Sequence, residues 1–207
     1  MSDDLIPDQA KVVFTDIAKT CSEIEKTVSK ILLEGLKAPY RPDIDITNIQ
    51  YLEIKLGFLK TLLKVSGVVG IVDMSSVDMH ARLRLEELKH FERKKETSAM
   101  IYEKPFNQLS PAELERLSVL MGELGESVQV IGKILQHGYE SQDPYNPEQI
   151  TNRQHLEKEL GDVLNGIHLL CKASDLDINM IQNQAIHKRS TIGQWLHHQN
   201  LEKLLED

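Results

Sequence analysis

Three stretches in the first half of this 207-residue chain recur in the second half, in the same order. The copies are offset by 103, 105 and 104 residues, and the longest pair matches at seven of thirteen positions. Chance similarity between amphipathic helices could produce one such match, but three in order predict an internal duplication. The fold must then be one that about a hundred residues can form twice. The paired stretches are 30–36 with 133–139, 39–42 with 144–147, and 47–59 with 151–163.

The second copy opens with the clearest helical pattern in the chain. Ser110 and Glu113 form a capping box, with Pro111 at the first helical position between them. Apolar residues then recur at steps of three and four as far as Gly138, a residue type that commonly ends helices. The predicted apolar stripe consists of Leu114, Leu117, Leu120, Leu124, Val128, Ile131 and Leu135.

Two further helices are predicted after the proline-containing loop at 143–147. The second extends from about 151 to about 172, and the third from about 177 to about 190. Strand signals are scarce, since only 65–72 is a short β-like run, so the sequence predicts an all-α helical bundle. The residues expected to face inward are Leu156, Leu160, Leu164, Ile167 and Leu170, followed by Ile178, Ile181 and Ala185.

The duplication suggests how the chain is divided. We expect a degenerate N-terminal repeat at 1–81, a charged helical linker and loop at 82–109, and a C-terminal repeat at 110–207. Because each repeat is long enough for several helices, we expect the two to pack as a pseudo-dimer within one chain. The long apolar stripe would then face Phe14, Ile17, Cys21, Val28 and Ile31.

Composition argues against several classes of protein. The chain has 24 Lys+Arg against 32 Asp+Glu, a net charge of −8, which does not suit a nucleic-acid polymer as partner. No apolar run approaches the ~18 residues of a membrane span. The acidic N-terminus lacks a signal pattern, and two cysteines without a CxxC pair provide no disulfide framework. We therefore expect a cytoplasmic protein.

Four acidic residues border the apolar stripes of two predicted helices in the second copy. Glu123 and Glu126 lie on one helix, and Glu159 and Asp162 lie on the next. Each pair has a spacing of three and borders its stripe on the same flank, so packing the helices together would gather four carboxylates. An isolated pair is more often a solvated face, but a buried group of four needs a cation. All-oxygen ligation favours Mg²⁺, with retained waters and substrate phosphates.

The first copy keeps the framework around these positions and loses most of the acids. Leucines and glycine at matching positions recur, whereas three of the four acids are replaced. This pattern is typical of a duplicated enzyme with one surviving site. The correspondences are Glu123 with Thr20, Glu126 with Glu23, Glu159 with Lys55, and Asp162 with Phe58.

The segments Met121–Glu126 and Leu156–Leu164 resemble the MazG-like nucleoside triphosphate pyrophosphohydrolases. That all-α superfamily carries E-E-x-x-E on one helix and E-x-x-D on the next, and the resemblance covers roughly 110–199. It implies hydrolysis of an NTP or dNTP to the monophosphate and pyrophosphate, with Mg²⁺ as cofactor and Mn²⁺ as a substitute. Gly122 replaces the first acid of the pattern. The implied metal ligands are Glu123, Glu126, Glu159 and Asp162.

The resemblance also implies phosphate contacts from the helix that follows, where Asn183, Lys188 and Arg189 are the candidates. Glu126 is the candidate general base, since a carboxylate not fully engaged by metal can take a proton from water. The nucleobase pocket is expected outside the metal cluster. Trp195, near the C-terminus, is interpreted as a core or interface anchor.

Two alternatives stay open. A carboxylate-bridged di-iron bundle needs two E-x-x-H motifs, and the chain offers one such spacing, Glu87 to His90. A catalytically inactive nucleotide-binding protein or helical interaction module would fit the loss of an acid at Gly122. A metal-dependent turnover assay separates the second alternative from an enzyme. Further homo-oligomerisation also stays open.

Overall fold

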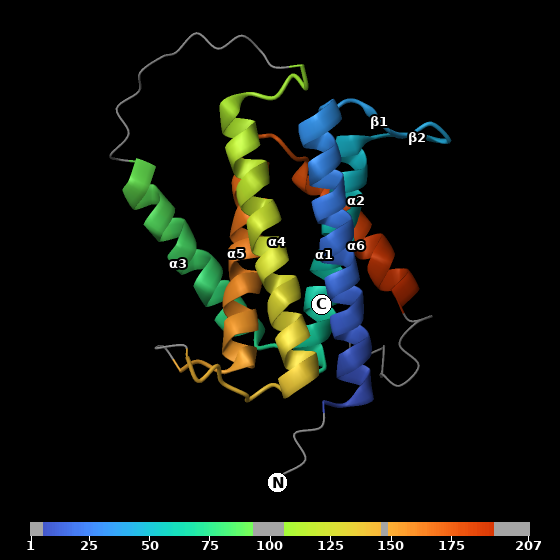
Figure 1. Cartoon of the computed structure of the whole chain (residues 1–207). Coiled ribbons are helices and arrows are strands. Elements are labelled where there is room, and N and C mark those ends of the chain that lie inside the picture. Colours follow the sequence, from blue (N-terminus) through green and yellow to red (C-terminus); the bar gives the residue numbers. More distant parts are fainter. Residues whose placement is uncertain (1–5, 93–105, 146–148, 193–207) are drawn as a thin grey trace.

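A computed structural model describes residues 6–92, 106–145 and 149–192 of the chain (Figure 1). Within these ranges the chain forms six helices and one short antiparallel hairpin, which confirms the all-α prediction. None of these helices is both long enough and apolar enough to cross a membrane. The helices are α1 (Asp8–Glu34), α2 (Asn48–Val68), α3 (Met74–Glu92), α4 (Pro111–His137), α5 (Asn152–Lys172) and α6 (Ile178–Ile192), and the strands are β1 (Pro39–Arg41) and β2 (Ile44–Thr47).

The ends of the main helices follow from local sequence. The Ser110 hydroxyl accepts a hydrogen bond from the backbone N–H of Glu113, whose carboxylate accepts one from the N–H of Ser110, as the capping box predicts. Thr151 caps α5 in the same way with Gln154. Gly138 ends α4 with φ +93°, a conformation that side chains with a Cβ rarely adopt. The predicted bounds of α4 and α5 are therefore confirmed to within a residue or two.

Helices α1 and α4 lie side by side at the centre and run in opposite directions (Figure 1). Helix α2 packs on α1, and α5 packs on α4. The remaining two described helices pack mainly on helices of the other half of the chain. Helix α3, from the first half of the chain, packs on α5, while α6, from the second half, packs on α2. Each half therefore contributes its third helix to the other half.

Two buried glutamates hold the exchanged helices by the same contact. The Glu157 carboxylate on α5 accepts a hydrogen bond of 2.8 Å from the backbone N–H of Asp73, just before α3. The Glu53 carboxylate on α2 accepts one of 2.7 Å from the N–H of Asp177, just before α6. The two contacts are related by a shift of 104 residues, the offset of the third sequence match.

Two glycines allow the exchanged helices to approach closely. A Cβ added at Gly161 of α5 would lie 2.7 Å from the carbonyl oxygen of Val77 in α3. A Cβ added at Gly57 of α2 would lie 2.7 Å from the carbonyl oxygen of Ile181 in α6. Both distances are too short for a side chain, so each interface requires glycine at this position.

The core forms where α1, α2, α4 and α5 meet, and the predicted α1 residues are all buried in it. Three residues expected to face inward are exposed instead: Leu114 and Leu135 at 42%, and Ile178 at 40%. Each lies in the first or last turn of its helix, where neighbouring helices cover less of the surface. The stripe on α4 consists of Leu117, Leu120, Leu124, Ser127, Val130, Ile131 and Ile134.

Three further segments differ from what the sequence predicts, and one predicted residue lies outside the described ranges. The segment 82–92, expected to be the start of a charged helical linker, is helical and continues α3 without a break, since 74–92 contains no glycine or proline. The β-like run at 65–72 begins as the last turn of α2. The β1–β2 hairpin was not predicted, although the alternation Ile44-Asp45-Ile46-Thr47 is a strand signal. Trp195 lies outside the described residues.

Candidate metal centre

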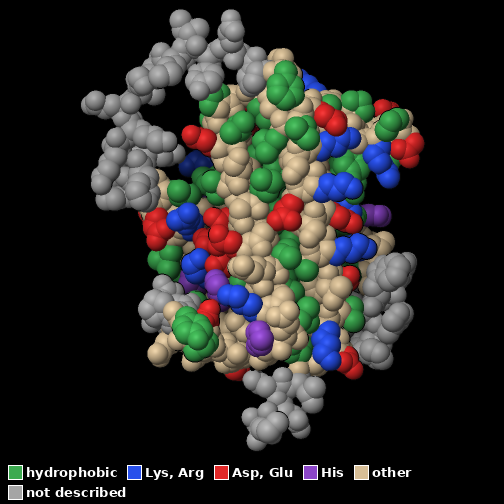
Figure 2. Space-filling model, viewed as in Figure 1, with side chains coloured by type: hydrophobic (Ala, Val, Ile, Leu, Met, Phe, Trp, Pro, Cys, Tyr) green, Lys and Arg blue, Asp and Glu red, His purple; other side chains and the backbone are tan. Residues whose placement is uncertain are grey.

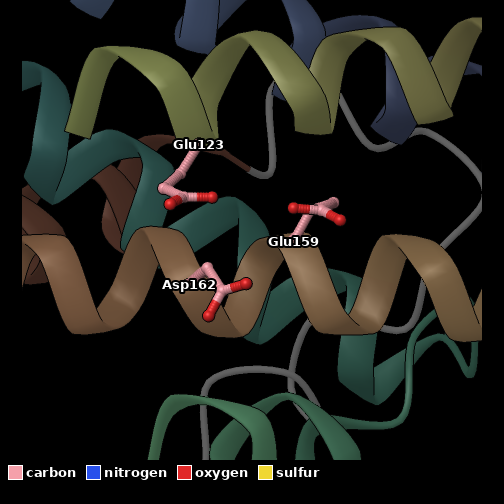
Figure 3. Close-up of side chains that lie close together, drawn as sticks. All are labelled: Glu123, Glu159 and Asp162. Carbon is pink, nitrogen blue, oxygen red and sulfur yellow. The ribbon is translucent and has the colours of Figure 1, made fainter. Parts of the chain in front are cut away.

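Three acids on the facing helices α4 and α5 point toward one another (Figure 3). Glu123 comes from α4, and Glu159 and Asp162 come from successive turns of α5. One carboxylate oxygen from each lies within 4.8 Å of the others. Glu159 and Asp162 are buried, and Glu123 is half-buried. Such a cluster could hold a metal ion.

Glu126 lies one turn beyond Glu123 on α4 and is exposed at the rim. Its carboxyl group lies near that of Glu159, although it lies outside the tight group of three. The structure therefore brings all four predicted acids together, with Glu126 at the edge.

The pKa values of Glu123 and Glu126 on α4 are both raised. Burial raises the pKa of Glu123, the negative charges of Asp162, Glu126 and Glu159 raise it further, and the positive charge of Arg84 opposes them. The pKa of Glu126 is also raised, by burial and by the neighbouring Glu159 carboxyl group. Burial is the largest cause of both shifts, and a bound cation would offset the negative charges that add to it.

Two basic side chains on α5 contact the acids, and neither was predicted. The Lys158 ammonium lies 2.9 Å from Oε1 of Glu159 and 3.4 Å from Oδ2 of Asp162. His155 Nε2 lies 3.0 Å from the same Glu159 oxygen. Burial would lower the pKa of Lys158, but its hydrogen bond and the charge of Glu159 raise it overall. Their spacing of one and four residues from Glu159 could have identified both residues.

The second oxygen of Glu159 provides a direct test of whether a metal fits. Oε2 of Glu159 is buried and has no hydrogen-bond partner among the described residues. A buried carboxylate oxygen without a donor is costly, because it has lost water and gained nothing in exchange. A hard cation among these three carboxylates would satisfy it, so the residues fit a metal ion.

A hollow of about 280 Å³ lies beside the acids, and helix α3 forms its opposite wall. We call it the acidic hollow. Arg84 and Glu87 of α3 line it together with Glu123, Glu126 and Asp162. Acidic and basic side chains gather next to each other on this face, over α3, α4 and α5 (Figure 2). Arg84 could not be predicted, because no local pattern shows that α3 packs on α5. Glu87 belongs to the single E-x-x-H spacing, which alone is too few for a di-iron site.

The residues predicted to bind phosphate lie elsewhere, because α6 packs on α2. Lys188 lines a separate hollow together with Lys55 and Phe58. Arg189 lines a larger cavity of about 840 Å³ that none of the four acids lines. Asn183 is exposed on α6. The structure therefore does not bring these three residues to the acidic hollow.

Residues 112–192 match the family model of the MazG nucleotide pyrophosphohydrolase domain. No curated protein and no solved structure matched the chain. The matched segment covers α4 from its second residue, α5 and α6, and it contains all four acids. This match supports nucleoside triphosphate pyrophosphohydrolase activity in general. Residues 112–192 are thus similar to the MazG nucleotide pyrophosphohydrolase domain.

Proposed function

We propose that the protein hydrolyses a nucleoside triphosphate, an NTP or dNTP, to the monophosphate and pyrophosphate. Mg²⁺ would be held by Glu123, Glu126, Glu159 and Asp162, with Mn²⁺ as a substitute. The observation that carries the proposal is the convergence of buried carboxylates around a Glu159 oxygen without a hydrogen-bond partner, inside the family-matched segment. A role in cleansing the nucleotide pool fits this chemistry. The free thiols Cys21 and Cys171 suit a cytoplasmic location.

The residues around the metal site would have different roles in the reaction. When bound, Mg²⁺ neutralises triphosphate charge and makes a water molecule more acidic. Glu126 lies at the exposed rim, and its raised pKa suits it to accept the proton of the attacking water on its carboxylate. Lys158 is the cation that now lies between Glu159 and Asp162. Once released from them, its ammonium can bind a phosphate oxygen instead.

Arg84 is the proposed phosphate-binding residue, in place of the α6 residues suggested by the sequence. It lines the acidic hollow from α3 and lies close enough to Asp162 and Glu123 for their charges to raise its pKa. Its guanidinium also lies 3.2 Å from Glu87 of the same helix. Because α3 precedes the family-matched segment, this assignment makes the site depend on both halves of the chain.

The two halves are further proposed to be duplicated repeats that pair as a pseudo-dimer with exchanged third helices. The Glu157 and Glu53 contacts, and the Gly161 and Gly57 contacts, support this proposal because each pair is related by the same offset. The N-terminal repeat would then extend to the end of α3 rather than to residue 81.

Product analysis with the full chain tests the proposed reaction. The protein is incubated with Mg²⁺ and a panel of NTPs and dNTPs, and the products are separated. We expect a monophosphate and pyrophosphate. Arg84→Ala should raise KM at least tenfold, whereas Arg82→Ala removes the same charge from another face of α3 and should change KM less than twofold. Diphosphate with phosphate as products, or no turnover of any nucleotide, would overturn the proposal.

A nucleotide-binding protein without turnover is the second candidate, and Gly122 favours it because the family pattern has an acid there. A Cβ at Gly122 would meet nothing within 4 Å, so a glutamate fits without clashes. If the wild type binds nucleotide without cleaving it and Gly122→Glu gains metal-dependent turnover, the second candidate is correct. Turnover by the wild type excludes it.

A further inference from the structure

A second hollow, of about 270 Å³, lies between α1, α2 and α6 in the first half of the molecule. Its wall positions correspond to those of the acidic hollow. Phe58 occupies the position of Asp162, and Lys188 of α6 occupies that of Arg84, each at an offset of 104. Lys55 also lines this hollow and corresponds to Glu159, which belongs to the acid cluster but does not line the acidic hollow. We call it the lysine hollow.

The charge of the lysine hollow is opposite to that of the acidic one. Lys19, Lys55 and Lys188 line it together with two acids, Asp16 and Glu23. The acidic hollow has four carboxylates in its wall, with Arg84 and Lys158 as the cationic side chains. One hollow therefore attracts cations, and the other carries net positive charge in a protein whose total is −8.

Between α1 and α2, the ammonium group of Lys55 takes the place that a metal ion would have in the acidic hollow. The Lys55 ammonium lies 2.6 Å from Oε2 of Glu23, and its side chain is only 14% exposed. Glu23 is the one acid that the first half retains at these positions. Because Lys55 already neutralises it, no metal ion is needed here, and Glu23 repels an incoming anion less strongly.

Two of the three lysines, Lys19 and Lys188, remain available to a ligand. Lys188 lies 5.1 Å from the ring centroid of Phe58, and Lys55 lies 5.2 Å from the same centroid, so both ammonium groups converge on one ring. In the described part of the chain, neither Lys188 nor the exposed Lys19 forms an ion pair with a carboxylate. Lysine side chains that converge without a carboxylate partner create a local positive potential.

We propose that the lysine hollow binds the phosphate groups of a small anion directly on Lys19, Lys55 and Lys188, without a metal ion. Lysine is a common phosphate ligand, and its ammonium acts as a point charge. Small-molecule pockets usually span ~300–1,000 Å³, so a hollow of about 270 Å³ suits a phosphate chain, just as the acidic hollow of about 280 Å³ would hold only the phosphate end of its substrate. A nucleoside attached to that chain would extend outside the hollow.

Calorimetric titration of the full chain with pyrophosphate in EDTA tests the proposal, because EDTA leaves the acidic hollow without a cation. We expect binding that weakens as salt rises. Lys188→Ala should weaken it at least tenfold, and Lys60→Ala, which removes the same charge from α2 outside the hollow, less than twofold. Glu23→Gln should tighten binding by releasing Lys55. Melting temperatures of the variants show whether each remains folded.

Titrations with phosphate, a nucleoside monophosphate and a nucleoside triphosphate then distinguish the ligand's source. Equal affinity for pyrophosphate and the triphosphate indicates that the phosphate chain alone is recognised, and tighter triphosphate binding indicates added nucleoside contacts. No binding of any of the four in EDTA overturns the proposal. So does a loss caused by Arg84→Ala rather than Lys188→Ala. Nucleotide turnover is measured separately, so an inactive enzyme that still binds pyrophosphate in EDTA would disprove only the proposed function.

Discussion

At the residue scale, the acids differ in how far their charge is already offset. Glu159 is 1% exposed and is contacted by both Lys158 and His155. Glu123 has no such ion pair among the described residues, and three carboxylates surround it. Removing the charge of Glu123 should therefore relieve repulsion, whereas removing that of Glu159 also loses two charge-assisted contacts.

Glu123→Gln should accordingly abolish turnover and raise the melting temperature of the metal-free protein. Glu159→Gln should abolish turnover without this gain in stability. The helical circular-dichroism signal should be unchanged in both variants. Thermal melting in EDTA and turnover assays with Mg²⁺ check the two effects on the same samples. Full activity in both variants would refute the metal-ligand assignment.

At the element scale, the exchanged helices are attached by close contacts that a single methyl group can disrupt. Gly161→Ala should destabilise the protein by ~1–3 kcal/mol, because the methyl group clashes with the α3 backbone. Gly57→Ala should cost a similar amount at α6. Only Gly161→Ala should also impair turnover, because only α3 carries Arg84 to the acidic hollow.

Urea unfolding and turnover of the same samples check this pair. Gly132→Ala is the control, since a Cβ there meets nothing within 4 Å and alanine favours the helix by up to ~1 kcal/mol. Equal effects of Gly161→Ala and Gly57→Ala on turnover would show that α3 has no special role at the acids.

The contact of Glu53 with the start of α6 predicts a pH dependence. Burial raises the pKa of Glu53 above its usual 4.5, and the charge of Asp177 adds to this, while the hydrogen bond from the Asp177 N–H opposes it. The folded state therefore holds the proton more tightly than the unfolded state. The resulting stability is fully present below pH 4.5 and is lost as pH rises through the folded pKa.

Glu53→Gln removes this titration, so its stability relative to wild type should improve between pH 4 and pH 7. Urea unfolding at both values measures the change. Glu115→Gln, at an exposed position of α4, is the control and should show a smaller change. The interpretation fails if the Glu53→Gln difference is the same at both values or decreases with pH.

At the scale of the whole molecule, the second half of the chain cannot bury its apolar surfaces without the first half. Its helix α4 is buried against α1, and its helix α5 against α3. A fragment from 107 to 207 would expose both surfaces. At ~25 cal/mol per Å² of apolar surface, several hundred Å² cost many kcal/mol, comparable to the stability of a domain.

We expect this fragment to aggregate or to dimerise with itself, and to lack normal turnover because Arg84 is missing. Co-expression with the fragment from 1 to 106 should restore a soluble complex and its activity. Size-exclusion chromatography and turnover assays check both expectations. A soluble, monomeric and fully active fragment would show that the first half is a separate domain.

The sequence by itself determined those features that depend on neighbours along the chain. Capping at Ser110 and Thr151, the glycine at 138 and the stripe on α4 defined the helices, because each rests on contacts within a few residues. Glu123, Glu126, Glu159 and Asp162 could be placed on facing flanks, because helical spacing fixes the direction of each side chain. The exposed end positions Leu114 and Leu135 were misplaced, because periodicity does not show where a neighbouring helix ends.

Only the tertiary structure decided which third helix joins which site. Helices α3 and α6 each follow a short turn and meet a glycine and a buried glutamate, so either could dock on α2 or α5 by the same local contacts. Choosing between them depends on how all six described helices close around one core, a nonlocal property that periodicity does not encode. That choice brings Arg84 to the acids and Lys188 to the lysine hollow.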